Sequence, residues 1–134
     1  MESIDPEQLE KDFIFANRRL VMYQDLNAAG RLFGGELMRW LDEATGQVAS
    51  RIMGTKDLVT KKFGEVVFDY PGRLGDSVEI WCRTFHEGTT SLGLEARVLV
   101  RGVKPVTLHQ ICHCTVVYVA LDATGRPAAW RKED

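Results

Sequence analysis

A single long amphipathic helix, with an uncharged face roughly half its circumference wide, sets the strongest limit on the fold. Residues 35–53 sort into two arcs when they are placed at about 100° intervals. Glu36, Arg39, Glu43, Gln47, Ser50 and Arg51 share the polar arc, whereas Leu37, Leu41, Ala44, Val48 and Ile52 form a stripe on the other. An uncharged face this wide predicts a helix that packs on two sides, and Gly54 is a natural stop.

Strand patterns dominate the rest of the chain. The segments 15–27, 66–71, 77–86, 91–100 and 106–121 are rich in β-branched and aromatic residues or alternate between apolar and polar residues. Short connections between consecutive strands favour antiparallel neighbours. The sequence therefore predicts an α+β fold, an antiparallel sheet of about five strands wrapped around one long central helix. We expect a single domain over residues 1–134, with residues 1–10 as a loose or partly helical arm.

Composition excludes several classes of protein. The 134 residues carry a formal net charge of −2, with scattered basic residues, which argues against nucleic acid as a partner. No apolar run is long enough for a membrane span. Three cysteines and no signal peptide argue against a disulfide framework and for a cytoplasmic protein. Because Cys112 and Cys114 would share one strand face and His113 the other, we expect buried cysteines and no metal.

One acid does not follow the charge pattern of the helix. Asp42 lies away from the other charged residues, beside small ones. The helical wheel leaves two interpretations equally open, a buried polar pair and a catalytic carboxylate. Gly34 and Gly35 precede it at the start of the helix, where bare N–H groups can bind a developing negative charge. The same glycines are also typical of an ordinary loop.

The segment "DLNAAGRLFGGELMRWLDEATG" at residues 25–46 resembles the hotdog-fold acyl-CoA thioesterases, in particular the group related to YciA and the cytosolic long-chain acyl-CoA hydrolases. The matching positions are Asp25, Asn27, Gly30, Gly34, Gly35 and Asp42. "FDYPGRLGD", "EGTTS" and "VALDATGRP" extend the resemblance over roughly residues 14–127.

The resemblance implies an acyl-CoA thioester hydrolase. It makes Asp42 the general base or the nucleophile, with both roles open, and places Asn27 of the facing subunit beside the water or the carbonyl. Amides near Gly34 and Gly35 would bind the thioester oxygen. No cofactor is implied, since coenzyme A belongs to the substrate. A homodimer would be the minimal unit, and a hexamer built from three dimers is common in the group.

Contacts to coenzyme A are expected at Gly88, Thr89, Thr90, Ser91 and Arg73. A plain hairpin turn explains residues 88–91 equally well, and a solvated charge is the favoured interpretation of Arg73. The alternative function is a hotdog module that binds or senses acyl-CoA without turnover. A hydratase is disfavoured because Phe33 occupies the loop and residues 1–85 contain no histidine.

Overall fold

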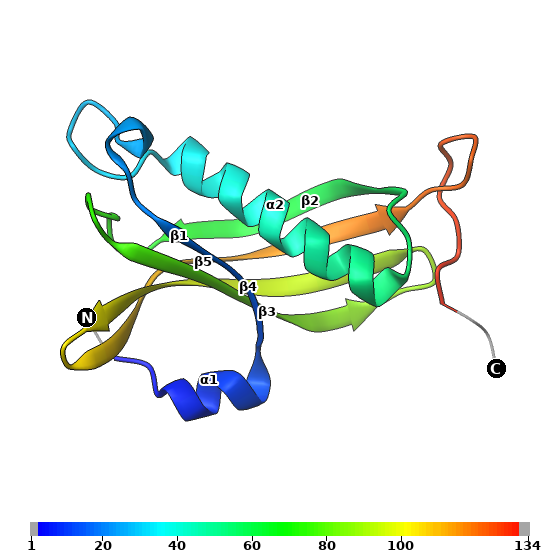
Figure 1. Ribbon diagram of the computed structural model, residues 1–134. Helices are drawn as coiled ribbons and strands as arrows, with labels where there is room; N and C mark the ends of the chain where they lie inside the picture. The colour runs from blue at the N-terminus through cyan, green and yellow to red at the C-terminus, as the bar shows by residue number, and fades with distance from the viewer. Residues whose placement is uncertain (1–2, 132–134) are drawn as a thin grey trace.

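The computed structural model describes residues 3–131, which form one five-stranded sheet and two α-helices. The elements are α1 (Pro6–Asp12), β1 (Ile14–Leu20), η1 (Tyr23–Asp25), α2 (Gly34–Met53), β2 (Leu58–Phe68), β3 (Ser77–Glu87), β4 (Ser91–Val103) and β5 (Val106–Ala120). The strands are antiparallel in the order β1-β3-β4-β5-β2. Helix α2 lies along one face of the curved sheet (Figure 1). The predicted α+β fold is confirmed.

Helix α2 buries the stripe that its periodicity predicts, apart from Ile52, which is half-buried. Its buried residues are Leu37, Trp40, Leu41, Ala44, Thr45, Val48, Ala49 and Met53. Gly54 ends the helix in the left-handed conformation, at φ 69°, which glycine adopts without strain. The facing sheet residues also alternate as predicted, because Ile80 and Cys82 of β3 and Leu94 of β4 are buried in the same core.

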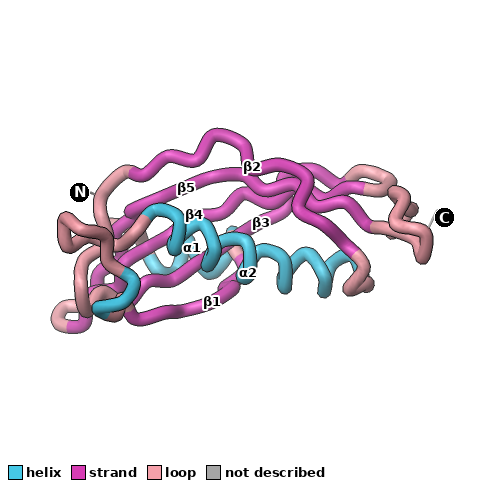
Figure 2. The backbone as a smooth tube through the Cα atoms, turned by 90° about the horizontal axis from the view of Figure 1, so that it is seen from above, coloured by secondary structure: helices cyan, strands magenta, loops and turns pink. Residues whose placement is uncertain are grey.

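Two predicted strand boundaries are wrong. The first strand ends at Leu20, and a 3₁₀ helix follows, with the Met22 N–H donating to Asp25 Oδ2 at 2.9 Å. Strand β2 begins at Leu58 rather than Val66. It forms one edge of the sheet (Figure 2), where side chains such as the exposed Lys61 remain solvated inside a strand. A prediction based on apolar residues therefore missed the first half of β2, because that half contains charged lysine residues.

The opposite face of the sheet carries a second, smaller core. The segment expected to be a loose or partly helical arm contains α1, which follows Asp5, whose Oδ1 accepts the N–H of Glu7. Leu9 of α1 packs with Phe13 against Trp81. The helix thus lies on the face away from α2 (Figure 1), and the central strands are covered on both sides.

A buried carboxylate links three strands on this outer face. Glu79 is fully buried and accepts hydrogen bonds from Trp81 at 2.9 Å, from Arg18 at 2.8 Å and from Arg101 at 2.5 Å. Burial alone would raise the pKa of Glu79, but these hydrogen bonds outweigh it and hold the pKa below its usual range. The charged form of Glu79 therefore stabilises the folded protein.

Replacing this charge is expected to lower stability in a pH-dependent way. Glu79→Gln should reduce the free energy of unfolding by about 1–3 kcal/mol at pH 7, since it leaves two arginines without their counterion. A carboxyl whose pKa is lower in the folded state stabilises the folded protein at pH values above its unfolded pKa of about 4.3. This contribution to the free energy of unfolding is lost as the pH falls through the folded pKa. Urea unfolding should show the difference from wild type shrinking toward pH 3, and a constant difference would contradict it.

Candidate active site

The carboxylate of Asp42 is held by two hydroxyl groups from the sheet. Thr60 of β2 donates to Asp42 Oδ1 at 2.6 Å. The Tyr118 hydroxyl, from β5, lies 3.1 Å from the same oxygen and 2.9 Å from the main-chain carbonyl of Asp42. The position of Asp42 apart from the other charges of the helix therefore has a physical reason, because its half-buried side chain is hydrogen-bonded to the sheet.

Tyr118 is itself fixed from the other side. The Thr45 hydroxyl lies 2.7 Å from the Tyr118 hydroxyl, and Thr45 also donates to the carbonyl of Leu41. Burial, together with the neighbouring carboxylate of Asp42, raises the pKa of Tyr118, so the phenol keeps its proton. A Cβ on Gly46 would lie 3.4 Å from the tyrosine oxygen, so Gly46 packs closely beside Tyr118. Tyr118 is therefore hydrogen-bonded both to helix α2 at Thr45 and to Asp42.

The second carboxylate oxygen is left open. Within residues 3–131, Thr60 and Tyr118 bind only Oδ1 of Asp42, and no side chain or amide binds Oδ2. Asp42 borders a cavity of about 460 Å³, whose other lining residues are Glu43, Gly46, Gln47, Ser50, Lys56, Leu58 and Thr60. One oxygen of Asp42 is thus anchored, and the other is free to meet a ligand.

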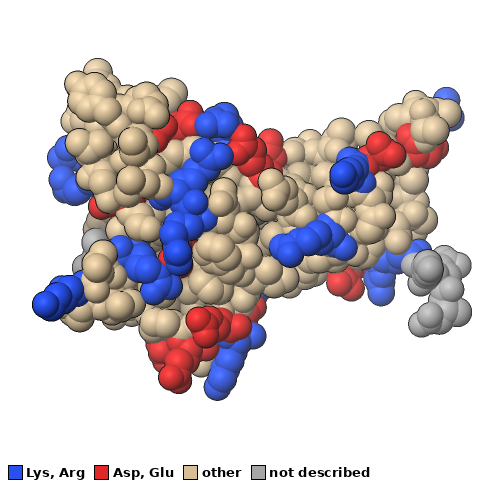
Figure 3. Space-filling model, viewed as in Figure 1, with Lys and Arg blue, Asp and Glu red and all other residues tan. Residues whose placement is uncertain are grey.

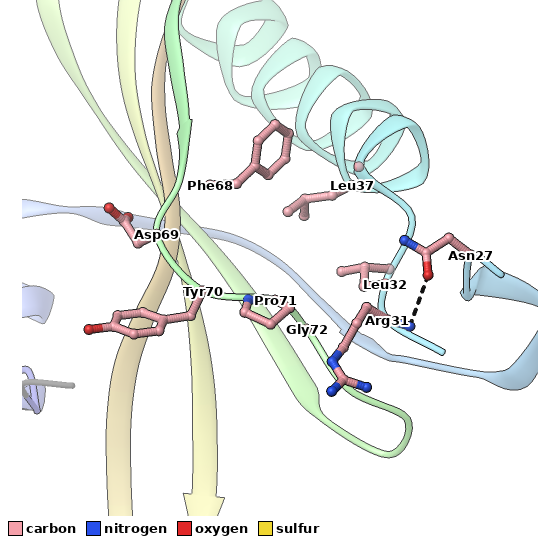
Figure 4. A pocket seen from close by; sticks show the side chains of 10 residues that line it. Asn27, Arg31, Leu32, Leu37, Phe68, Asp69, Tyr70, Pro71 and Gly72 are labelled. Carbon is pink, nitrogen blue, oxygen red and sulfur yellow. Dashed lines mark hydrogen bonds between the residues drawn. The ribbon is translucent and has the colours of Figure 1, made fainter. Parts of the chain in front are cut away.

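A second cavity lies at the start of α2. It has a volume of about 360 Å³ and is lined by Asn27, Arg31, Leu32, Gly34, Leu37, Phe68, Asp69, Tyr70, Pro71 and Gly72 (Figure 4). The cap residue of α2, Phe33, makes no side-chain capping hydrogen bond. The first N–H groups of the helix therefore lack a side-chain acceptor, which suits them to an oxyanion.

Asn27 presents a hydrogen-bond donor to this second cavity. Its Oδ1 accepts the N–H groups of Ala29 at 3.0 Å and of Arg31 at 3.1 Å, which identifies that atom as the carbonyl oxygen. Its amide nitrogen points toward Phe68 and Leu37 (Figure 4). The turn thus uses the oxygen of Asn27 and leaves the NH₂ group for a ligand.

The two halves of the predicted site occupy different cavities of one subunit. Asn27 and Gly34 line the cavity at the start of α2, whereas Asp42 lines the cavity farther along the helix. Gly35 lies beside the ring of Phe33, where an added Cβ would come within 3.2 Å. A single chain therefore holds the carboxylate and the amide donors apart.

Comparison with known proteins identifies the family. Residues 29–107 match the family model of the Thioesterase superfamily. The chain belongs to this superfamily. It is 33% identical over 115 residues to the acyl-CoA thioester hydrolase YciA of Escherichia coli K12, and the match covers 84% of this chain and 86% of YciA.

Solved structures of the superfamily share the fold. The hexameric thioesterase y2039 from Yersinia pestis aligns with a TM-score of 0.82 and 28% identity, over 90% of this chain and 97% of that one. The acyl-CoA hydrolase from Staphylococcus aureus, in complex with butyryl coenzyme A, aligns with a TM-score of 0.81 and 26% identity, over 90% and 73%. The predicted hotdog fold and the resemblance to the YciA group are both confirmed.

The residues predicted to contact coenzyme A lie at opposite ends of the sheet. Arg73 belongs to the β2–β3 connection near the start of α2, and residues 88–91 form the β3–β4 turn near the end of α2 (Figure 1). The carbonyls of Thr89 and Ser91 accept the main-chain and indole N–H groups of Trp130. The turn is therefore hydrogen-bonded to the C-terminal segment of the same chain.

The sequence did not predict that three hydroxyl residues surround Asp42, namely Thr60, Tyr118 and Thr45. Tyr118 stands in a run of apolar strand residues, and Thr60 precedes the segment predicted as a strand. Thr45 could have been predicted to lie near Asp42, because it is one helical turn from Leu41 and from Asp42 on the uncharged arc of the helix. The residues meet only through the pairing of β2 with β5, in which Thr60 is opposite Tyr118.

Other kinds of site find no support among residues 3–131. No group of three histidine, cysteine or acidic side chains in this part of the chain is arranged to hold a metal ion. No helix there is long and apolar enough to cross a membrane. Basic side chains gather in a strip on the face that carries α2 (Figure 3), and acidic side chains border it; Arg39 pairs there with Glu36 and Glu43.

Proposed function

We propose that this protein hydrolyses the thioester bond of acyl-CoA, releasing coenzyme A and a carboxylic acid. The observation that carries the proposal is the carboxylate of Asp42, anchored through Oδ1 by Thr60 and Tyr118 with Oδ2 open. Relatives that bear the name acyl-CoA thioester hydrolase support it. A cytoplasmic location and the absence of any cofactor beyond coenzyme A in the substrate remain predictions.

The open oxygen of Asp42 serves either of two routes. As general base it takes a proton from water while the water oxygen attacks the thioester carbon; the C–S bond then breaks and the thiolate takes up the proton. As nucleophile it attacks the same carbon, expels the thiolate and forms an anhydride, which water then hydrolyses. Both routes need Oδ2 unoccupied and aimed steadily at the carbonyl.

Negative charge on the thioester oxygen would be stabilised at the start of α2. The N–H groups near Gly34 and Gly35 stand at the start of the helix, where they lack intrahelical acceptors, and Asn27 lines the same cavity as Gly34. Neither group lines the cavity of Asp42 in the same chain. A complete site therefore requires the donors of a second subunit.

A two-fold dimer through β2 would bring the halves together. Strand β2 is an edge of the sheet, with the cavity of Asp42 and Thr60 at its beginning and the cavity of Gly34 and Phe68 at its end. Two copies of β2 paired antiparallel about their midpoint place the end of one beside the beginning of the other. Each Asp42 then faces the Asn27 and the helix start of the partner subunit.

Release of free coenzyme A tests the proposed function. A thiol-release screen with short, medium, long and aryl acyl-CoAs should show multiple turnovers for at least one of them. The protein's own thiols should stay silent, since burial raises the pKa of Cys82 and Cys114 to about 11 and of Cys112 to about 12. Acyl-CoA that raises the melting temperature but is never cleaved would instead establish the acyl-CoA-binding module.

The hydroxyl of Tyr118 is expected to position Asp42 for the reaction. Tyr118→Phe removes a donor to Oδ1 and should lower kcat about tenfold with little change in KM, since Tyr118 does not line either cavity. Tyr23→Phe, at an exposed phenol that lines neither cavity, is the matched control, and a Tyr118→Phe protein with the kcat of wild type would remove this role.

A further inference from the structure

Two arginines are held opposite each other at the start of α2. Arg31 and Arg73 are partners in an antiparallel β-bridge, and the adjacent Leu32 N–H donates to the carbonyl of Gly72 at 2.9 Å. Directly opposed residues of an antiparallel pair project to the same side. Figure 4 shows the Arg31 side chain extending over the segment that follows Gly72. The two guanidinium groups therefore share one side of this connection.

Nearby carboxylates do not neutralise this pair. Asp69, which lines the same cavity as Arg31, is paired with His113 at 3.0 Å. Asp76, which lines a neighbouring cavity with Arg73, accepts the main-chain N–H of Arg73 and not its guanidinium. Among residues 3–131, neither arginine forms an ion pair. Like charges placed directly opposite each other destabilise a sheet, and a bound anion would relieve that cost.

The arginine pair adjoins the cavity of the thioester donors. Arg31 lines that cavity together with Asn27 and Gly34. The neighbouring cavity, of about 190 Å³, contains Arg73 and shares Tyr70 and Pro71 with the first. A ligand that extends out of the first cavity past Tyr70 and Pro71 thus meets both guanidinium groups.

We propose that Arg31 and Arg73 form one binding site for an oxyanion of the substrate. Guanidinium groups bind phosphate and carboxylate through paired N–H donors, and both anions occur in thioesters of coenzyme A. The anion is a phosphate of the coenzyme or the terminal carboxylate of a dicarboxylic acyl chain. This inference rests on the proposed function for the identity of the ligand, but the site itself can be tested without turnover.

Equilibrium binding to the Asp42→Asn protein separates the two sources of the anion. Titration calorimetry would compare butyryl-CoA, succinyl-CoA and S-butyryl-pantetheine, which lacks the phosphates. Arg31→Ala and Arg73→Ala should each weaken binding about tenfold for both CoA thioesters, and leave S-butyryl-pantetheine unchanged, if the anion is a phosphate. A loss confined to succinyl-CoA assigns the site to the acyl carboxylate. Either pattern supports the oxyanion site.

Further variants serve as controls for the effect of charge and for correct folding. Arg31→Lys and Arg73→Lys should keep most of the affinity, and Lys11→Ala, at an exposed position on α1, should change nothing. The loss caused by each alanine should shrink in about 0.5 M salt, since screening weakens exposed charges. Should an alanine variant have a lowered melting temperature, the glutamine variant replaces it. Equal losses for S-butyryl-pantetheine and the CoA thioesters, or no loss for any ligand, overturn the proposal, whether or not the wild type hydrolyses acyl-CoA.

Discussion

Asp42→Asn is expected to lower kcat for acyl-CoA hydrolysis by about 10³-fold or more. An amide can neither accept the proton of the attacking water nor form an anhydride, so both routes lose their essential atom. Steady-state thiol release with the best acyl-CoA of the screen measures the loss. KM should change little, since binding of the substrate does not depend on the charge of Asp42.

The fold should survive this substitution. The carbonyl oxygen of an asparagine can accept the hydrogen bonds that Thr60 and Tyr118 now give to Oδ1. The melting temperature should therefore stay near that of wild type, and Asp12→Asn, at an exposed position on α1, should keep its activity. A folded Asp42→Asn protein that retained most of its turnover would remove Asp42 from the reaction.

Asn27→Asp is expected to have the second largest effect, a loss of about 10²-fold in kcat. The carboxylate can still accept the N–H groups of Ala29 and Arg31 and so preserve the turn, but it has no donor for the thioester oxygen. It also places a negative charge where the transition state develops one. Thiol release by this variant and by Asn27→Ala, compared at saturating acyl-CoA, measures the contribution of the donor.

The comparison between these two variants is informative. Asn27→Ala removes donor and turn acceptor together and should lower the melting temperature, whereas Asn27→Asp should not. Activity of Asn27→Asp equal to wild type would show that the NH₂ group of Asn27 plays no part, and that the helix amides alone stabilise the charge.

The sequence predicted the elements whose pattern is local. Helix α2 and the buried faces of β3 and β4 follow from periods of 3.6 and 2 residues, which are written in consecutive positions. Asp42 stood out for the same reason, since the helical wheel separated it from the other charges. Its interpretation, however, needed the spacing to Gly34 and Gly35 and the likeness to a family.

Features that depend on contacts across the sheet were not predictable in this way. Tyr118 meets Asp42 only because β5 pairs with β2 in a register that no local pattern reports. The packing of α1 was equally hidden, since it requires Trp81 to face away from the main core. The bridge between Arg31 and Arg73 joins two loops that are distant in the sequence.

Subunit mixing tests most directly the claim that Asp42 works with the Asn27 of a partner subunit. Asp42→Asn and Asn27→Asp chains, each inactive alone, would be co-expressed with different tags and the mixed dimers purified. Each mixed dimer then contains one site with both substitutions and one site with neither, so it should recover about half of the wild-type activity per dimer. If both residues acted within one chain, every site would carry a substitution, and mixed dimers as inactive as their parents would contradict the shared site.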